Sequence, residues 1–203
     1  MKLTLYFALL LSLFLPLYAN AMGQKEYELR RAMDSLWVDH GAWTRSFIIE
    51  AVNNNASGKE AAANRLMKNQ EDIGNVVASF YGSEAGNTLT SLLKDHIKIS
   101  ADVVAAAKAN NQSQLQAANN RWHANADDIA RFLTNANPKN WPFKIVQNML
   151  YDHLKLTTDE AVARIKKDWD ADVTAFDNVL KQLQVMSKAL ADGIVHQFPV
   201  KFK

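Results

Sequence analysis

Apolar residues recur at steps of three and four along most of this chain, which is the period of an α-helix. The region from about residue 83 to about residue 109 illustrates the pattern. Its repeating apolar positions are Leu89, Leu92, Leu93, Ile97, Val103 and Val104. Alternation of apolar and polar residues, which would predict a β-strand, is not convincing anywhere in the sequence. The pattern therefore predicts an all-α protein.

Glycine, proline and asparagine residues divide this pattern into helical segments, because they favour turns and helix ends. Long helices are predicted at about 25–52, 59–80, 83–109 and 113–135, a short helix at about 143–155, and a last long helix from a capping box at Thr157–Glu160 to about Asp192. The loops between successive helices are short, so neighbouring helices should be antiparallel. We expect an antiparallel up-and-down bundle of four to five long helices plus one short helix.

The first 21 residues are predicted to be a signal peptide. Lys2 precedes an apolar run from Leu3 to Tyr18, and Ala19-Asn20-Ala21 matches the small-x-small site of a signal peptidase. The run is shorter than the roughly 20 residues of a membrane-spanning helix. We predict cleavage after Ala21, which leaves residues 22–203 as a single helical-bundle domain, periplasmic or secreted and without stable membrane insertion. The alternative is an uncleaved N-terminal anchor.

Composition narrows the range of functions. The formal net charge is only +2 and the charges are interspersed, so nothing in the sequence favours nucleic-acid binding. The chain has no cysteine, which excludes thiolate chemistry and cysteine-ligated metal and leaves core packing alone to hold the fold. The sequence contains no glycine-rich phosphate loop, no Gly-x-Ser-x-Gly motif and no dinucleotide-binding fingerprint. The sequence therefore gives little support for an enzymatic function.

A faint repeat runs through the predicted helices. His40 follows an aspartate and is followed 29 residues later by Asn69, and His96 stands in the same relation to Asn125. A third Asp-His pair ends at His153, 57 residues after His96, but its downstream half has diverged. The repeat unit would be a helix hairpin, produced either by duplication or by chance in a helix-rich sequence.

Polar residues interrupt the apolar stripes at core-facing positions on five of the predicted helices. They lie at similar distances from the connecting loops, so at about 1.5 Å per residue they should form one polar layer at mid-height in the bundle. This layer is predicted to contain His40, Asn69, His96, Asn125 and Asp172, with Asp72 and Asp128 at its edge. We expect His153 to face solvent near an edge of the bundle, and His123 and His196 to lie at the surface.

Three interpretations of this layer remain open in the sequence. The first is a hydrogen-bond network that only fixes helix register. The second is a site for a divalent transition metal, whose possible ligands are His40, His96, Asp172, Asp72 and Asp128. The asparagines would then hold these ligands in place by hydrogen bonds. The third is a pocket for a small molecule, lined by Trp37, Trp43, Trp122, Trp169, Asn69 and Asn125. Motif support for the metal is weak, because the Glu-x-x-His motif of di-iron bundles does not occur.

Three strings resemble those of a family of small bacterial helical proteins. They are Leu36-Trp37-x-Asp39-His40-x-x-Trp43-Thr44-Arg45, Lys68-Asn69-Gln70-x-Asp72-Ile73-Gly74-Asn75 and Leu92-Leu93-x-Asp95-His96-Ile97. The resemblance extends over nearly the whole chain after the predicted signal peptide. It implies the same domain limits and adds no mechanism.

The leading prediction is an exported binding protein whose polar layer takes a metal ion or a small ligand. The alternative is a non-catalytic structural or interaction module in which the layer only fixes register, and a metal-dependent enzyme comes third. Binding or catalysis requires free ligand atoms and a path from solvent to the layer. A structural role requires a closed layer in which each histidine is hydrogen-bonded within the protein.

Overall fold

The computed structural model describes residues 23–203, so the predicted signal peptide lies outside the described residues. Within this range the chain forms six α-helices of 24 to 29 residues and no β-strand. The elements are α1 (Gln24–Val52), α2 (Ala56–Tyr81), α3 (Ser83–Lys108), α4 (Gln112–Ala136), α5 (Phe143–Lys166), α6 (Trp169–Gln197) and the short 3-10 helix η1 (Pro199–Phe202). The predicted all-α bundle is confirmed.

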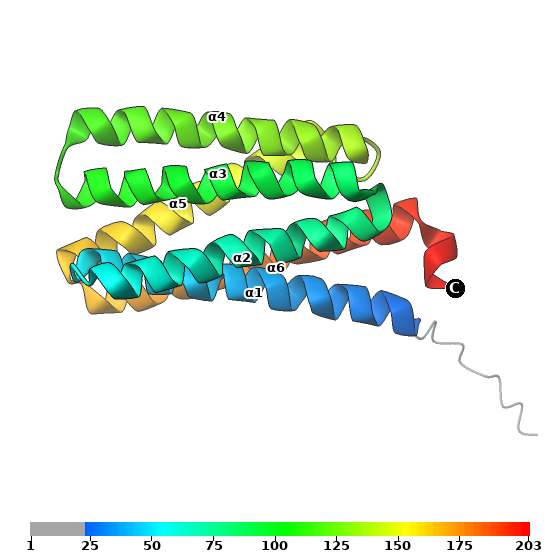
Figure 1. Cartoon of the computed structure of the whole chain (residues 1–203), viewed down its shortest axis with the longest axis horizontal. Helices are drawn as coiled ribbons and strands as arrows, with labels where there is room; N and C mark the ends of the chain where they lie inside the picture. Colours follow the sequence, from blue (N-terminus) through cyan, green and yellow to red (C-terminus); the bar gives the residue numbers. More distant parts are fainter. Residues whose placement is uncertain (1–22) are drawn as a thin grey trace, which may run out of the picture.

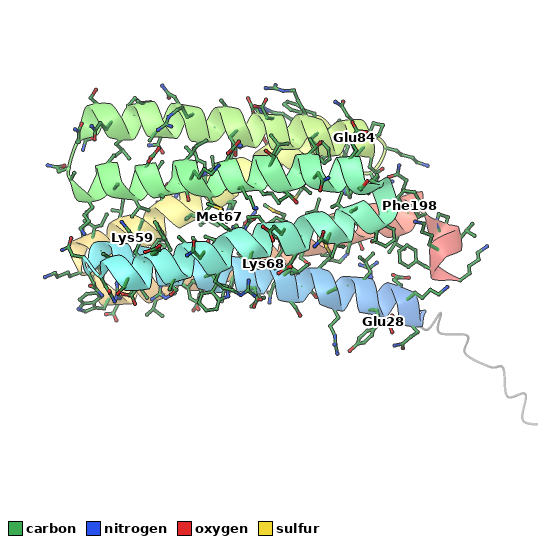
Figure 2. All side chains as sticks on the ribbon, in the orientation of Figure 1. Glu28, Lys59, Met67, Lys68, Glu84 and Phe198 are labelled. Atoms are coloured by element: carbon green, nitrogen blue, oxygen red, sulfur yellow. The ribbon has the colours of Figure 1, made fainter. Side chains whose placement is uncertain are left out.

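The helices form a closed ring of antiparallel neighbours. Each helix packs against the next along the chain, and α6 returns to pack against α1 (Figure 1). Helices α1, α3 and α5 also touch one another across the centre. Figure 2 shows Lys59 and Phe198 at opposite ends of this bundle. Among residues 23–203, no helix combines the length and the apolar character that a membrane crossing requires.

The structure differs from the predicted elements after residue 155. The presumed capping box at Thr157–Glu160 lies inside α5, which continues to Lys166, so the predicted short helix is a long one. The end of this helix lies eleven residues later than predicted. Lys167 takes a left-handed φ of 59°, and the Asp168 side chain caps α6 by accepting a hydrogen bond from the backbone N–H of Ala171. Thr157 and Glu160 are buried, so core packing outweighs their capping preference.

The turns at one end of the bundle show that the fold consists of three equivalent hairpins, α1–α2, α3–α4 and α5–α6. Each turn has one left-handed residue followed by a helix N-cap. The left-handed residues are Asn54, Asn110 and Lys167, with φ of 61°, 52° and 59°. The caps are Asn55, Asn111 and Asp168, and each side chain accepts a hydrogen bond of 3.1 Å from the backbone N–H three residues later. The third hairpin therefore has the same turn geometry as the other two, although its sequence did not predict a turn at this position.

The core follows the same repeat. A small apolar cluster near the turns contains Ile48, Val104 and Ala161, one buried residue from each hairpin. These residues lie at the same distance from the histidine of their own hairpin. A larger cluster fills the rest of the bundle. Burial of one large aliphatic side chain contributes about 1.5 to 3 kcal/mol, so the repeated apolar positions supply most of the stability.

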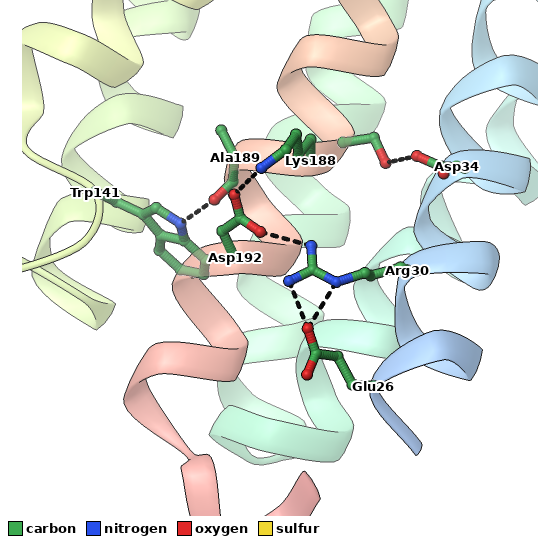
Figure 3. A network of polar contacts seen from close by, with 8 residues as sticks. Glu26, Arg30, Asp34, Trp141, Lys188, Ala189 and Asp192 are labelled. Carbon is green, nitrogen blue, oxygen red and sulfur yellow. Dashed lines mark hydrogen bonds and ion pairs between the residues drawn. The ribbon is translucent and has the colours of Figure 1, made fainter. Parts of the chain in front are cut away.

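The contact between α1 and α6 closes the ring without a connecting loop, and polar side chains reinforce it (Figure 3). The Arg30 guanidinium of α1 donates to Glu26 on its own helix and to Asp192 on α6. One turn away, the Ser187 hydroxyl of α6 donates to the Asp34 carboxylate of α1. The first and third hairpins are thus joined by directional bonds as well as by apolar contact.

The loop between α4 and α5 covers the end of the bundle opposite the equivalent turns. Trp141 is 2 % exposed, and its indole N–H donates to the carbonyl of Ala189 at 3.2 Å (Figure 3). The indole lies so close to Gly193 that a Cβ atom at that position would overlap it. Asn137 holds the same loop by donating to the Gly193 carbonyl at 2.9 Å. Trp141 thus packs the loop over this end of the bundle.

Candidate functional site

Three histidines meet at the centre of the bundle, one from each hairpin. His40 lies on α1, His96 on α3 and His153 on α5, and their exposed fractions are 3 %, 4 % and 4 %. The ring centroids of His40 and His153 are 5.5 Å apart, and those of His96 and His153 are 6.2 Å apart. The prediction that His153 faces solvent was wrong. Together these rings form the layer that we call the histidine layer.

Each hairpin carries one further hydrogen bond beside its histidine. An amide side chain on the second helix donates to the backbone carbonyl four residues before the histidine on the first. The pairs are Asn69 to Leu36 at 2.9 Å, Asn125 to Leu92 at 3.0 Å and Gln182 to Met149 at 2.9 Å, each 33 residues apart. Figure 2 shows Lys68, the neighbour of Asn69, near the middle of α2, which places these bonds at mid-height.

The hydrogen bonds of His96 fix its tautomer. The Asn125 amide donates through Nδ2 to a carbonyl, so its Oδ1 is the atom that faces His96 Nδ1, at 2.8 Å. On the other side of the ring, the Trp122 indole N–H donates to His96 Nε2 at 3.1 Å. Nδ1 must therefore carry the proton and Nε2 must be unprotonated. Both nitrogens of this neutral imidazole are used within the protein.

The environments of His40 and His153 differ from that of His96. Leu66 and Val179 occupy the positions of the first and third hairpins that correspond to Trp122, so neither hairpin supplies an indole donor there. The Gln70 amide nitrogen lies 3.3 Å from His40 Nδ1 and also donates to the Leu66 carbonyl at 2.8 Å. The three hairpins are therefore equivalent in backbone and different in the bonds made to the rings.

Burial keeps all three rings neutral. Loss of water around the ring, and next the nearby His96, lower the pKa of His40 to about 3. Burial lowers the pKa of His96 to about 4, while its bond to Asn125 opposes the shift. The pKa of His153 is also far below its ordinary value, first because of burial and then because of the other two histidines. An imidazolium in this layer would be unsolvated and beside two other rings.

The acidic residues that we predicted for this layer lie elsewhere. Asp72 is one-third exposed and pairs with Lys68, and Asp128 is exposed and pairs with Arg131. Asp172 is in the first turn of α6, at one end of the bundle, because that helix begins twelve residues later than we expected. No group of three histidine, aspartate or glutamate residues between 23 and 203 has an arrangement that could hold a metal ion.

Asp172 belongs to a buried charge cluster instead. Its carboxylate is 2 % exposed and accepts hydrogen bonds from both terminal nitrogens of Arg45, at 2.9 and 3.0 Å, and from Arg164 at 3.1 Å. Arg45 also donates to the fully buried Glu160 at 2.8 Å. These four residues join α1, α5 and α6 near the turns. Buried carboxylates need such partners, since leaving one unpaired costs several kcal/mol.

Glu160 is the least satisfied member of this charge cluster. Its Oε2 atom has no hydrogen-bond partner among the described residues. Burial raises the pKa of Glu160 to about 7, although the Arg45 hydrogen bond opposes the rise. Phe47 and Val103 occupy the corresponding positions of the other two hairpins. Glu160 thus has no acidic counterpart in the other two hairpins, so the charge cluster does not follow the threefold repeat.

The predicted tryptophan pocket is not formed. Trp37 and Trp122 are buried beside the histidine layer, with ring centroids 5.6 Å from His40 and 5.3 Å from His96. Trp43 instead packs under the Arg65 guanidinium, and Trp169 is 54 % exposed on the outside of α6. The two cavities beside the layer have volumes of about 30 and about 10 Å³, far below the several hundred cubic ångströms of a ligand pocket.

Sequence reasoning missed two residues of the site, His153 and Gln182. The signal for His153 was present, since it follows His96 by nearly the same interval that separates His40 and His96. The signal for Gln182 was hidden, because a glutamine stands where the other hairpins have asparagine. Its longer side chain still reaches the carbonyl of Met149.

We predict that Trp122→Phe destabilises the fold by about 1 to 3 kcal/mol, because it leaves the buried Nε2 of His96 without a donor. Urea unfolding followed by circular dichroism measures this change. Trp169→Phe is the matched control, because this indole is 54 % exposed, and we expect a change below about 0.5 kcal/mol. Equal effects of the two substitutions would contradict the assigned hydrogen bond.

The histidine layer also predicts acid sensitivity. The unfolded histidines bind protons below their ordinary pKa of 6.5, whereas the folded rings stay neutral to about pH 4. Stability is therefore complete above about pH 6.5 and falls as the pH falls, by about 1.4 kcal/mol per pH unit for each ring. Glu160 opposes this loss with one proton, because its raised pKa keeps it protonated in the folded state over the same range.

The net slope between pH 5 and pH 6 should thus be about 2.7 kcal/mol per pH unit, which is two protons. Glu160→Gln removes the opposing proton, so the slope should steepen to about 4 kcal/mol per unit. Urea unfolding at several pH values measures both slopes. A free energy of unfolding that is constant over this range would refute the assignment of three neutral rings.

Comparison of the chain with known protein families, with curated proteins and with solved structures found no match. The resemblance of the strings around His40, Asn69 and His96 to a family of small bacterial helical proteins therefore stays a prediction. The function of the chain has to be inferred from its own geometry.

Proposed function

We propose that the bundle is a non-catalytic structural or interaction module, in which the histidine layer fixes the register of three hairpins. The observation that carries this proposal is the hydrogen bonding of His96. Asn125 accepts the proton on Nδ1 and Trp122 donates to Nε2, so neither nitrogen is free to bind a metal or to act on a substrate. The low exposure of all three rings also supports a closed layer.

A register role has a clear physical basis. A buried imidazole that loses its partner costs about 1 to 3 kcal/mol, so a one-turn slip of α4 against α3, which would break both bonds of His96, would be penalised at this level. His153 does not contribute in this way, because its Nδ1 has no hydrogen-bond partner among the described residues. The three amide-to-carbonyl bonds of the layer add the same penalty within each hairpin. Apolar contacts alone would discriminate less sharply between registers, because they are not directional. Export is part of the proposal and rests on the pattern of the first 21 residues.

Metal binding is the second candidate, and the short distances between the three rings favour it. Imidazole is a common ligand of divalent zinc, copper and nickel. Binding would use His40 and His153 and would require Trp122 to release His96. This candidate therefore predicts that Trp122→Phe increases metal affinity, whereas the structural module predicts no change.

A zinc titration by calorimetry distinguishes the two candidates, using untagged protein that was first treated with a chelator. We expect no stoichiometric binding in the wild type or in Trp122→Phe, and only weak surface binding that His123→Gln reduces. One zinc ion per chain, retained in His123→Gln and bound more tightly by Trp122→Phe, would overturn the structural module in favour of the metal site.

A further inference from the structure

A second polar layer lies one helical turn from the histidine layer. Thr44, Ser100 and Thr157 each follow the histidine of their own hairpin by four residues, so they occupy equivalent positions on α1, α3 and α5. All three line the same internal cavity, whose volume is about 10 Å³. One hydroxyl from each hairpin therefore faces the axis at this level.

Two of these hydroxyls are buried and unsatisfied. Thr44 is 7 % exposed and Thr157 is 4 % exposed, and neither Oγ1 has a hydrogen-bond partner among residues 23–203. A buried hydroxyl without a partner costs about 1 to 3 kcal/mol. The Ser100 hydroxyl donates to the carbonyl of Ile97 at 2.8 Å, so its lone pairs remain able to accept.

Two other threonines of the third hairpin satisfy their hydroxyls within their own helix. A helical threonine can donate to the carbonyl four residues earlier. Thr158 and Thr174 do so, each at 2.8 Å, to Leu154 and Asp170. Thr44 and Thr157 make no such bond to any described residue. Their hydroxyls are thus available to a partner inside the cavity.

The size and lining of the cavity identify the class of that partner. A cavity of about 10 Å³ accommodates one water molecule and nothing larger, and a buried water needs two to four polar contacts. We propose that one water molecule binds here, held by a hydroxyl from each of the three hairpins. It joins the three hairpins one turn from the histidine layer.

The larger cavity provides an internal contrast. Its volume is about 30 Å³, and it lies on the other side of the histidine layer, next to Met33, Trp37 and Leu93. The surface that its lining residues expose to it is apolar. Water is not stable in a cavity without polar partners. The smaller cavity is therefore wet and the larger one dry, the reverse of what volume alone would suggest.

A crystal structure at high resolution tests this inference directly. We expect one ordered water within hydrogen-bonding distance of Thr44, Ser100 and Thr157, and no water in the larger cavity. Two results would overturn the inference: hydroxyls of Thr44 and Thr157 bonded to the carbonyls of His40 and His153 around an empty cavity, or water found only in the larger cavity.

Variants supply the second measurement, in which oxygen-17 relaxation dispersion counts the long-lived internal waters. The double substitution Thr44→Val and Thr157→Val should lower the count by one. Thr174→Val is the control, because its hydroxyl is satisfied by its own helix, and the count should not change. The double substitution to serine keeps both hydroxyls and should keep the water. An unchanged count in the folded double valine variant, or a lost water in the serine variant, would contradict the site.

Discussion

Three imidazole rings in the centre of a helix bundle can be tolerated only while they are neutral, and each unprotonated or protonated nitrogen that finds a partner there is stabilised. A charged ring at this position would lose its solvation and would lie beside two other rings. His96 meets this requirement with an asparagine and a tryptophan, each supplied by α4. Its bonds exist only when α3 and α4 are in register. The chemistry of a buried ring thus restrains the relative position of whole helices.

The three hairpins share one backbone geometry and differ in their side chains. The turns, the N-caps and the amide-to-carbonyl bonds recur in each copy. The side chains around them do not, since Trp122 has no aromatic counterpart and Glu160 replaces the apolar Phe47 and Val103. Such differences mark where the three hairpins make different contacts. In the third hairpin the difference is a charge cluster that binds Arg45 of the first hairpin and helps to close the ring.

Much of the fold could be predicted from sequence, because helical periodicity and turn residues act locally. The core-facing positions of His40, Asn69, His96 and Asn125 also followed from that periodicity. Asp172 could not be placed correctly, because its height depended on where the last helix begins. That start was decided by Lys167 and Asp168, whereas the Thr157–Glu160 pattern was a stronger local signal that core packing overrode. Local sequence signals fail where two of them predict different helix starts and packing against distant residues determines which start is used.

A register role for the histidine layer depends on the protonation states of its three rings, which two-dimensional nitrogen-15 NMR of the imidazoles measures. At pH 6 we expect neutral signals for His40, His96 and His153, with the proton of His96 on Nδ1. The exposed His123 and His196 serve as internal references in the same spectrum. A buried ring that titrates near its ordinary pKa of 6.5, or a His96 proton on Nε2, would contradict the hydrogen bonds on which the histidine layer depends.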